Sequence, residues 1–182
     1  MAGRRSDTKE RIQQVALELF AERGYDKTSL KDVAARLEIT RPALYYHFKT
    51  KEDILNGVVA DLGSSLNELT EWAVRQPKTP AARREVLTRL SGLFTDQWVP
   101  LMRFAQVNQA AMDELPIGAE MRERMLGLLA VLDDPGAAPE KRFELRLAVI
   151  TVMISGVPML FEDIPMDDRT AVAMAVAEKL IA

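Results

Sequence analysis

Apolar residues recur at intervals of three and four along almost the whole chain, and this spacing restricts the chain to helical folds. Ile12, Val15, Ala16, Leu19 and Phe20 form the first such stripe, which has the spacing of one face of an α-helix. No convincing run alternates between apolar and polar residues with period two, as a half-buried strand would. The sequence therefore predicts an all-α protein.

Turn residues and capping residues divide the chain into about nine helices. We expect three short helices near 7–23, 30–37 and 40–47, a long fourth helix over 50–75, and five more near 81–98, 100–114, 118–132, 139–161 and 167–181. Thr40 suits the N-cap of the third helix, Pro42 suits its first turn, and Thr50 with Asp53 suits the start of the fourth. The predicted domains are residues 1–50, a small module, and residues 51–182, a helical body that the long helix joins to it.

The composition argues against several classes of enzyme. The 182 residues include no Cys and a single His, which excludes disulfides, thiolate zinc sites and a metal site with two His ligands. We find no Gly-rich phosphate loop and no paired carboxylates on an apolar face. The sequence predicts no enzyme, no metal and no cofactor.

No segment of the sequence predicts targeting or membrane insertion. The longest uncharged run, 147–161, is shorter than the roughly 20 residues that a membrane span needs, and no apolar stretch follows the basic residues near Met1. We expect a cytoplasmic protein with no membrane partner.

The charge is distributed unevenly along the chain. Residues 1–51 carry 11 Lys and Arg against 7 Asp and Glu, whereas residues 52–182 carry 13 against 20. A basic module beside an acidic body favours binding of a polyanion by the module. Chance is the alternative, because the positive excess is modest.

The helices predicted near 30–37 and 40–47 flank a tight turn, which is the helix-turn-helix arrangement. Leu44 and Phe48 are one turn apart and can face inward, which leaves Arg41, Tyr45 and Tyr46 facing outward. Tyrosine hydroxyls and cations reach DNA phosphates while the start of such a helix enters the major groove. The alternative for a tyrosine here is packing against the fourth helix.

Further residues at fixed spacing extend this motif. They are Ile12, Ala16, Leu19-Phe20, Gly24-Tyr25, Thr28-Ser29, Asp32-Val33-Ala34, Ile39-Thr40, Leu44-Tyr45-Tyr46-His47-Phe48, Lys51 and Leu55. In these positions residues 8–55 resemble the N-terminal domain of the TetR-like transcriptional repressors. One position departs from the pattern: Glu38 stands four residues after Ala34, where helix-turn-helix turns usually have a glycine and often a positive φ.

The resemblance implies DNA-binding roles for ten residues. Arg41 and Ala43 would face base edges, and Lys31 would reach a base or a phosphate. The phosphate contacts would come from Thr28, Ser29, Thr40, Tyr45, Tyr46, His47 and Lys51. The partner implied is a double-stranded DNA operator, bound by a homodimer.

The helix predicted over 139–161 is apolar on two faces, and both faces must be buried. One stripe contains Phe143, Leu147, Ile150 and Ile154, and the other contains Leu145, Val149, Val152 and Met153. One stripe can meet the chain's own core while the other meets a second chain. We assign the dimer interface to Leu145, Val149, Val152 and Met153, with Val172 and Val176 of the last helix. In the alternative, a third helix of the same chain covers the second face.

The helical body also offers candidates for a ligand pocket, because methionine and aromatic residues recur on its helices. These candidates are Trp72, Phe94, Trp98, Met102, Met112, Met121 and Met125, with Asn108 as a polar anchor. As an alternative, these residues form ordinary core and the Asn108 amide bonds to neighbouring backbone.

Together these features predict a ligand-responsive transcriptional repressor that a small, mostly apolar effector releases from a palindromic operator. One alternative is a TetR-like regulator without a small-molecule inducer. Another is an all-helical carrier or enzyme, against which the lack of clustered acid–base residues or a cofactor motif argues.

Overall fold

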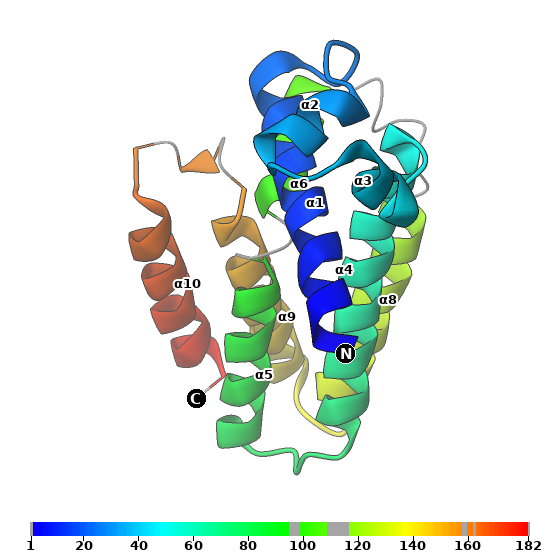
Figure 1. The fold of residues 1–182 in the computed structure, drawn as a ribbon. Helices are drawn as coiled ribbons and strands as arrows, with labels where there is room; N and C mark the ends of the chain where they lie inside the picture. Colours follow the sequence, from blue (N-terminus) through cyan, green and yellow to red (C-terminus); the bar gives the residue numbers. More distant parts are fainter. Residues whose placement is uncertain (1, 95–98, 109–116, 158–159, 162, 182) are drawn as a thin grey trace. The chain divides into compact units, whose positions relative to one another are not determined.

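In the computed structural model, residues 2–94, 99–108, 117–157, 160–161 and 163–181 are described. Over these residues the chain forms nine α-helices and no strand (Figure 1). The all-α prediction is confirmed. The residues group into two compact units, residues 1–61 with 100–117, and residues 62–99 with 118–182. The first unit thus extends beyond residue 50 and includes a segment from the second half of the chain.

The helices keep close to the expected ranges. They are α1 (Ala2–Arg23), α2 (Leu30–Arg36), α3 (Arg41–His47), α4 (Lys51–Val74), α5 (Pro80–Leu93), α6 (Val99–Val107), α8 (Ile117–Leu132), α9 (Pro139–Ser155) and α10 (Met166–Leu180). The largest differences are at α6, which ends at Val107 rather than near 114, and at α9, which ends at Ser155 rather than near 161. Gly156 is its C-cap, and Pro158 in the sequence disfavours helical backbone at the residue before it.

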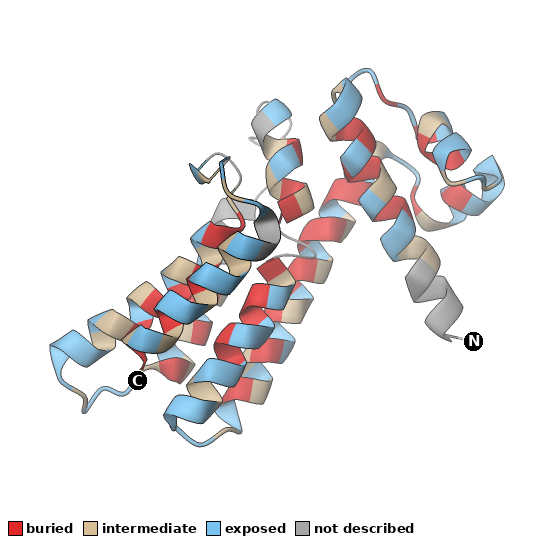
Figure 2. Ribbon diagram, turned by 90° about the vertical axis from the view of Figure 1, so that its left-hand side faces the viewer, coloured by how far each residue is buried: buried red, intermediate tan, exposed pale blue. Residues whose placement is uncertain are grey.

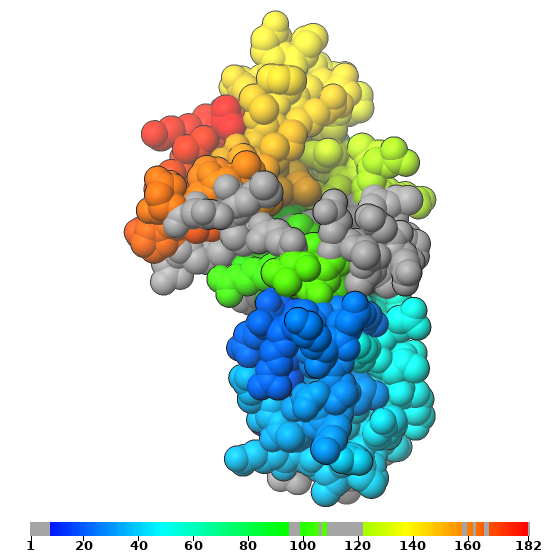
Figure 3. All heavy atoms as spheres, turned by 90° about the horizontal axis from the view of Figure 1, so that it is seen from above, coloured from blue at the N-terminus to red at the C-terminus, as the bar shows by residue number. Residues whose placement is uncertain are grey.

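The first unit has a core to which α1, α2, α3 and α4 all contribute. Ile12, Phe20, Val33, Leu44 and Ile54 are almost completely buried, and α2 packs against both α1 and α3. At the surface of this unit, α1 (dark blue) and α2 with α3 (lighter blue) are open to view (Figure 3). The apolar stripes of short helices thus become one shared core, which fixes α2 and α3 relative to each other.

The first unit also carries a polar contact between α1 and α4. The Lys9 ammonium and the Gln13 amide each donate to the Asp61 carboxylate, at 2.7 Å. Gln13 is buried, so its amide needs this partner.

The second unit contains the remaining part of α4 together with α5, α8, α9 and α10. α10 packs against α9 and α5, and Leu87, Leu90, Leu128 and Val152 are completely buried. Buried residues follow stripes along these helices, with exposed residues on the opposite sides (Figure 2). Among the described residues, no helix is both long and apolar enough to cross a membrane.

Candidate nucleic-acid interface

The start of α2 is fixed by a capping box at Ser29. The Ser29 hydroxyl accepts a hydrogen bond from the Asp32 N–H at 3.3 Å, and the Asp32 carboxylate accepts one from the Ser29 N–H at 2.8 Å. The hydrogen bond from the Ser29 hydroxyl is the main reason why the pKa of Asp32 lies below its ordinary value of 3.8. With Leu30 and Val33 buried, Lys31 lies on the exposed side of α2.

The turn between α2 and α3 contains a left-handed residue. Glu38 has φ +56°, as expected from its place four residues after Ala34. The turn is closed by the Ile39 N–H, which donates to the Ala34 carbonyl at 3.1 Å. Because a Cβ disfavours this conformation by about 1 kcal/mol, the chain stores a small strain where a glycine would store none.

The third helix begins as the sequence predicts. The Thr40 hydroxyl accepts from the Ala43 N–H at 3.3 Å, and Pro42 occupies the first turn. Leu44 is completely buried and Phe48 nearly so. These two anchors turn the opposite side of α3 outward, where Arg41 and Ala43 are exposed.

The two tyrosines of α3 both face outward. Tyr45 is 43% exposed and Tyr46 is 64% exposed, so the alternative in which a tyrosine packs beneath α4 is wrong. The Tyr46 ring meets the half-buried His47 ring edge to face, with 5.3 Å between centroids, and the Lys49 ammonium donates to the Tyr45 carbonyl. A seven-residue helix therefore presents two aromatic side chains, an arginine and a histidine together.

The structure corrects the role of Thr28. Its side chain is buried, and its hydroxyl donates to the Gly24 carbonyl at 2.9 Å and lies 3.3 Å from the Leu19 carbonyl. A hydroxyl held in this way cannot reach a phosphate. Thr28 instead ties the end of α1 to the start of α2.

Lys51 is also used differently from the expectation. Its ammonium donates to the Tyr25 carbonyl at 2.5 Å and lies 4.1 Å from the centroid of the Tyr25 ring. The cation is half-buried and holds the turn after α1 against the start of α4. We therefore treat Lys51 as a positioning residue rather than as a phosphate contact.

Asn108, at the end of α6, binds the same turn. Its side-chain oxygen accepts from the Tyr25 N–H at 2.6 Å, and its amide nitrogen donates to the carbonyls of Phe20 at 3.1 Å and Phe104 at 3.0 Å. The assignment of Asn108 as a ligand anchor is wrong, because both ends of its amide bond to backbone. The sequence signal for this tie was weak, since 83 residues separate Asn108 from Tyr25.

The other ligand-pocket candidates fall into three groups. Phe94 and Met125 are buried in the second unit, and Met102 is half-buried in the first. The Trp72 ring is half-buried and has the Arg89 guanidinium 3.8 Å from its centroid, so one ring face is already covered. Trp98, Met112 and the side chain of Met121 lie outside the described residues.

On α9, the stripe predicted to form the dimer interface is buried, and the opposite stripe is exposed. Leu145, Val149 and Val152 lie in the core of the chain itself and Met153 is half-buried, so the first three cannot contact a second chain. The other stripe is exposed instead, with Phe143 at 63% and Ile150 at 47%. Val172 and Val176 of α10, which were also assigned to the interface, are indeed exposed.

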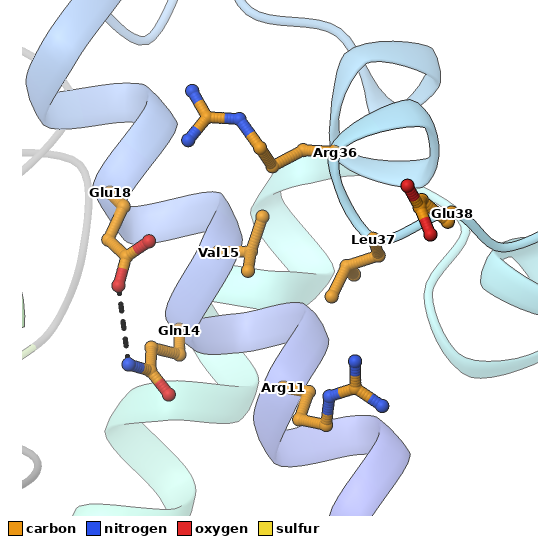
Figure 4. A pocket seen from close by; sticks show the side chains of 7 residues that line it. All are labelled: Arg11, Gln14, Val15, Glu18, Arg36, Leu37 and Glu38. Carbon is orange, nitrogen blue, oxygen red and sulfur yellow. Dashed lines mark hydrogen bonds between the residues drawn. The ribbon is translucent and has the colours of Figure 1, made fainter.

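A cleft of about 370 Å³ lies where α1 meets the end of α2 (Figure 4). Its lining residues are Arg11, Gln14, Val15, Glu18, Arg36, Leu37 and Glu38. Two arginines and two glutamates line it. Gln14 donates to Glu18 at 3.2 Å, and Arg36 pairs with Glu22 outside the cleft at 2.9 Å. The balance of charge gives this cleft no preference for an anion or a cation, and among the described residues no cluster of His, Asp and Glu suits a metal ion.

The sequence of the segment that contains α2 and α3 is similar to that of known transcriptional regulators. Residues 12–58 match the model of bacterial regulatory proteins of the tetR family. Over 83 residues the chain is 36% identical to the HTH-type transcriptional regulator AcrR of Shigella flexneri, covering 44% of this chain and 39% of AcrR. Over 61 residues it is 39% identical to IcaR of Staphylococcus aureus, a negative transcriptional regulator of a biofilm operon, covering 34% of this chain and 33% of IcaR.

These matches to curated proteins therefore span only about a third to two fifths of the relatives' lengths. The structural similarity covers more of the chain than the sequence similarity does. The crystal structure of the TetR-family regulator PfmR from Thermus thermophilus superposes with a TM-score of 0.58 and 23% identity, covering 94% of each chain. This likeness shows that the chain, including the helical body, has the same fold as PfmR.

Proposed function

We propose that this chain is a homodimeric, TetR-like transcriptional repressor that binds a palindromic operator and is released by a small, mostly apolar effector; the match of residues 12–58 to the tetR-family model supports the proposal. The outward face of α3 carries this proposal, because Tyr46 is 64% exposed on a helix of only seven residues. The exposed part of an aromatic side chain contributes little to the stability of the fold. Against DNA it gains a phosphate contact through its hydroxyl.

The roles in DNA binding follow from position on the two helices. Arg41 is in the first turn of α3, where an arginine can bind guanine O6 and N7 with two hydrogen bonds. Ala43 lies in the same turn of α3, where its methyl group can make apolar contact with a base edge. Phosphates are left to Lys31, Ser29, Thr40, Tyr45, Tyr46 and His47, all of them exposed except the half-buried His47.

The DNA-binding proposal is tested by comparing specific with unspecific binding. Sequencing of genomic fragments retained by the purified protein would first supply the operator. Arg41→Ala should then cost about 1–3 kcal/mol on the operator and little on a scrambled duplex. Arg36→Ala is the matched control, because Arg36 is exposed on α2 and pairs with Glu22. Equal losses of binding free energy on both duplexes would show that Arg41 contacts a phosphate rather than a base.

Phosphate contacts have a different signature. Lys31→Ala should weaken binding to both duplexes alike and lower the salt dependence by roughly two units, since a dimer loses one contact in each copy. Tyr46→Phe should also weaken both duplexes but leave the salt dependence unchanged, because it removes no charge. Titrations at several salt concentrations measure both effects.

The dimer is supported by the exposed apolar face of the second unit. On α9 the side chains of Phe143, Ile150 and Ile154 are exposed, and on α10 those of Val172 and Val176. Exposed apolar side chains that recur along one face of a helix favour an interface with another chain. The packing of α9 against α10 would let both helices contribute to a symmetric contact between two copies.

The dimer is tested by light scattering on one variant of this face. Ile150→Glu should give a mass near the 20.4 kDa of one chain, because a charge in the contact would be desolvated without a partner. Leu126→Glu makes the same kind of change at an exposed position on α8 and should leave the dimer intact. A wild-type protein that is monomeric at micromolar concentration would refute the assembly.

The effector proposal is supported by the apolar character of the second unit, where Phe94 and Met125 are buried. A thermal-shift screen of apolar compounds would find candidates. By linkage, an effector that lowers DNA affinity must bind the DNA-bound protein more weakly by the same factor. If every compound that binds leaves DNA affinity unchanged, the regulator without a small-molecule inducer is the correct alternative.

A further inference from the structure

A cavity of about 300 Å³ in the second unit lies between the start of α5, the start of α9 and the end of α10. Its lining residues are Lys78, Pro80, Arg83, Asp133, Asp134, Ala137, Lys141, Arg142, Leu145, Leu180 and Ile181. None of these residues belongs to the apolar effector candidates or to the exposed face of α9. The cavity combines four cations with only two carboxylates, and it needs a separate explanation.

The carboxylates do not balance the cations evenly. Asp133 is held by Arg142, whose Nη2 and Nε donate to it at 2.7 Å and 3.1 Å, and the pKa of Asp133 is lowered chiefly by these bonds. The Asp134 carboxylate accepts from the Gly136 N–H at 3.0 Å. Both acids are therefore engaged by other groups. Arg142 pairs with Asp133, and Lys141 pairs at 3.0 Å with Glu144, which does not line the cavity, whereas Lys78 and Arg83 have no acid partner among the described residues.

Of these two cations, Arg83 is the one without an acceptor among the described residues, since the Lys78 ammonium donates to the Asp133 carbonyl at 2.7 Å. The Nε of Arg83 is buried without a hydrogen-bond partner among the described residues, and its guanidinium has no ion pair in that part of the chain. The next residue, Arg84, pairs with Glu178 at 3.0 Å. A buried, unpaired guanidinium nitrogen is costly, because it has given up water and gained no acceptor. An anion in the cavity would give the guanidinium group of Arg83 an acceptor and neutralise its charge.

The rest of the lining limits what the anion can be. Leu145 and Ile181 are nearly buried and, with Leu180 and Pro80, give the cavity an apolar wall. A guanidinium presents a planar fork that matches a carboxylate. The volume is at the small end of the range for ligand sites. A short aliphatic carboxylate fits the charge, the wall and the size, whereas inorganic phosphate would leave the apolar wall uncovered.

We propose that this cavity is a binding site for a small organic carboxylate, with Arg83 pairing the carboxylate and Leu145, Leu180 and Ile181 contacting its apolar tail. The Lys78 ammonium, which donates to the Asp133 carbonyl at 2.7 Å, adds positive charge at the edge of the site. The site stands independently of the proposed DNA binding and of the apolar effector.

Isothermal titration calorimetry with octanoate as the probe tests the site. Octanoate should bind the wild-type protein, and Arg83→Gln should weaken that binding by about tenfold or more, as expected for a lost charge-assisted hydrogen bond. Arg84→Gln is the matched control, because it removes the same charge one residue further along α5 from a side chain that does not line the cavity. It should leave the affinity unchanged.

Two further ligands separate the sources of affinity. Octanamide has the same tail without the charge and should bind far more weakly, and inorganic phosphate has charge without a tail and should not bind in the cavity. The proposal is overturned if octanoate does not bind at millimolar concentration, if Arg83→Gln binds it as well as the wild type does, or if phosphate binds in its place.

Thermal unfolding shows whether the variant remains folded. Without octanoate, Arg83→Gln should melt no lower than the wild type, because it removes an unpaired buried group. Octanoate should raise the melting temperature of the wild type and of Arg84→Gln but not of Arg83→Gln. If Arg83→Gln does not fold, Arg83→Lys tests the same pairing, because it keeps the charge but loses the planar fork, and unchanged octanoate affinity there would count against the site. Operator binding is measured separately, so a failure of DNA binding cannot be mistaken for a failure of this site.

Discussion

Replacing Asn108 with alanine tests how α6 is attached to the first unit. The substitution removes one hydrogen bond accepted from the Tyr25 N–H and two donated to the carbonyls of Phe20 and Phe104. The two carbonyls keep another partner, since the Gly24 N–H donates to Phe20 and the Asn108 N–H donates to Phe104. Of these three backbone groups, the Tyr25 N–H is therefore the one that depends on the lost side chain.

The cost can be estimated from this difference. An N–H left without its acceptor costs about 1–3 kcal/mol, whereas the loss of a bond whose acceptor keeps a partner costs less. Asn108→Ala should therefore lower the free energy of unfolding by about 2 kcal/mol. The Phe20, Tyr25 and Phe104 rings, whose centroids lie 5.1–5.9 Å apart, keep their contacts, so the unit should remain folded.

Urea unfolding followed by circular dichroism measures this loss. Asn56→Ala is the matched control, because Asn56 is an exposed asparagine on α4 of the same unit, and it should change stability by less than about 0.5 kcal/mol. A ligand anchor would behave oppositely: its removal would weaken effector binding and leave the free protein unaffected. A loss below about 0.5 kcal/mol in Asn108→Ala would therefore refute the structural role.

Three further predictions concern backbone strain, close packing and charge. Glu38→Gly should stabilise the protein by about 1 kcal/mol in urea unfolding by relieving the positive φ, and a destabilised variant would show that the Glu38 side chain has a role of its own. Gly57→Ala should be destabilising, because its Cβ would lie 3.1 Å from the buried Phe48 ring. Gly63→Ala on the same helix should cost less, because its Cβ would meet only the end of the Arg124 side chain, which can move. Thermal melts in which Gly63→Ala is the less stable variant would contradict this. The folded-state pKa of Asp133 lies below 3.8, chiefly because of Arg142, so its contribution to stability is present above that pH and is lost as the pH falls through the folded-state value. Stability measured from pH 6 to pH 2 should therefore fall less steeply in Arg142→Gln, and parallel curves would exclude the ion pair as the cause.

The parts of the fold that depend on local pattern could be predicted from the sequence. The start of α3 at Thr40, the outward tyrosines and the left-handed Glu38 depend on residues within about ten positions of one another, where capping and periodicity decide. The composition likewise shows that the chain has no Cys and a single His, which excludes disulfides and thiolate zinc sites. Helix ends were less accurate, because the final turn depends on neighbouring elements as well as on local sequence.

The parts that depend on long-range contacts could not be predicted. Lys51 has the sequence position of a phosphate contact, but its ammonium is 2.5 Å from the carbonyl of Tyr25, 26 residues earlier in the chain. Asn108 was placed correctly on the inward side of its helix, yet which backbone groups would meet it depends on how α6 packs against the turn after α1. Thr28 was predicted as a phosphate contact, and only its burial and its bond to the Gly24 carbonyl show that it is a tie within the fold.

The reversed stripe of α9 illustrates the same limit and also shows a signal that could have resolved it. The two stripes are equally apolar, so hydrophobicity alone cannot decide which one meets the core. The buried stripe also contains Ala148, Ser155 and Gly156, and small residues mark the side on which a helix approaches its neighbours closely. At Gly156 a Cβ would lie 3.3 Å from Val99 Cγ2, so there is little room for a larger side chain. The exposed stripe has Phe143 and Ile150 instead, whose bulk suits a contact with a second copy. A charge at Val149 should consequently unfold the chain, whereas a charge at Ile150 should separate two folded chains.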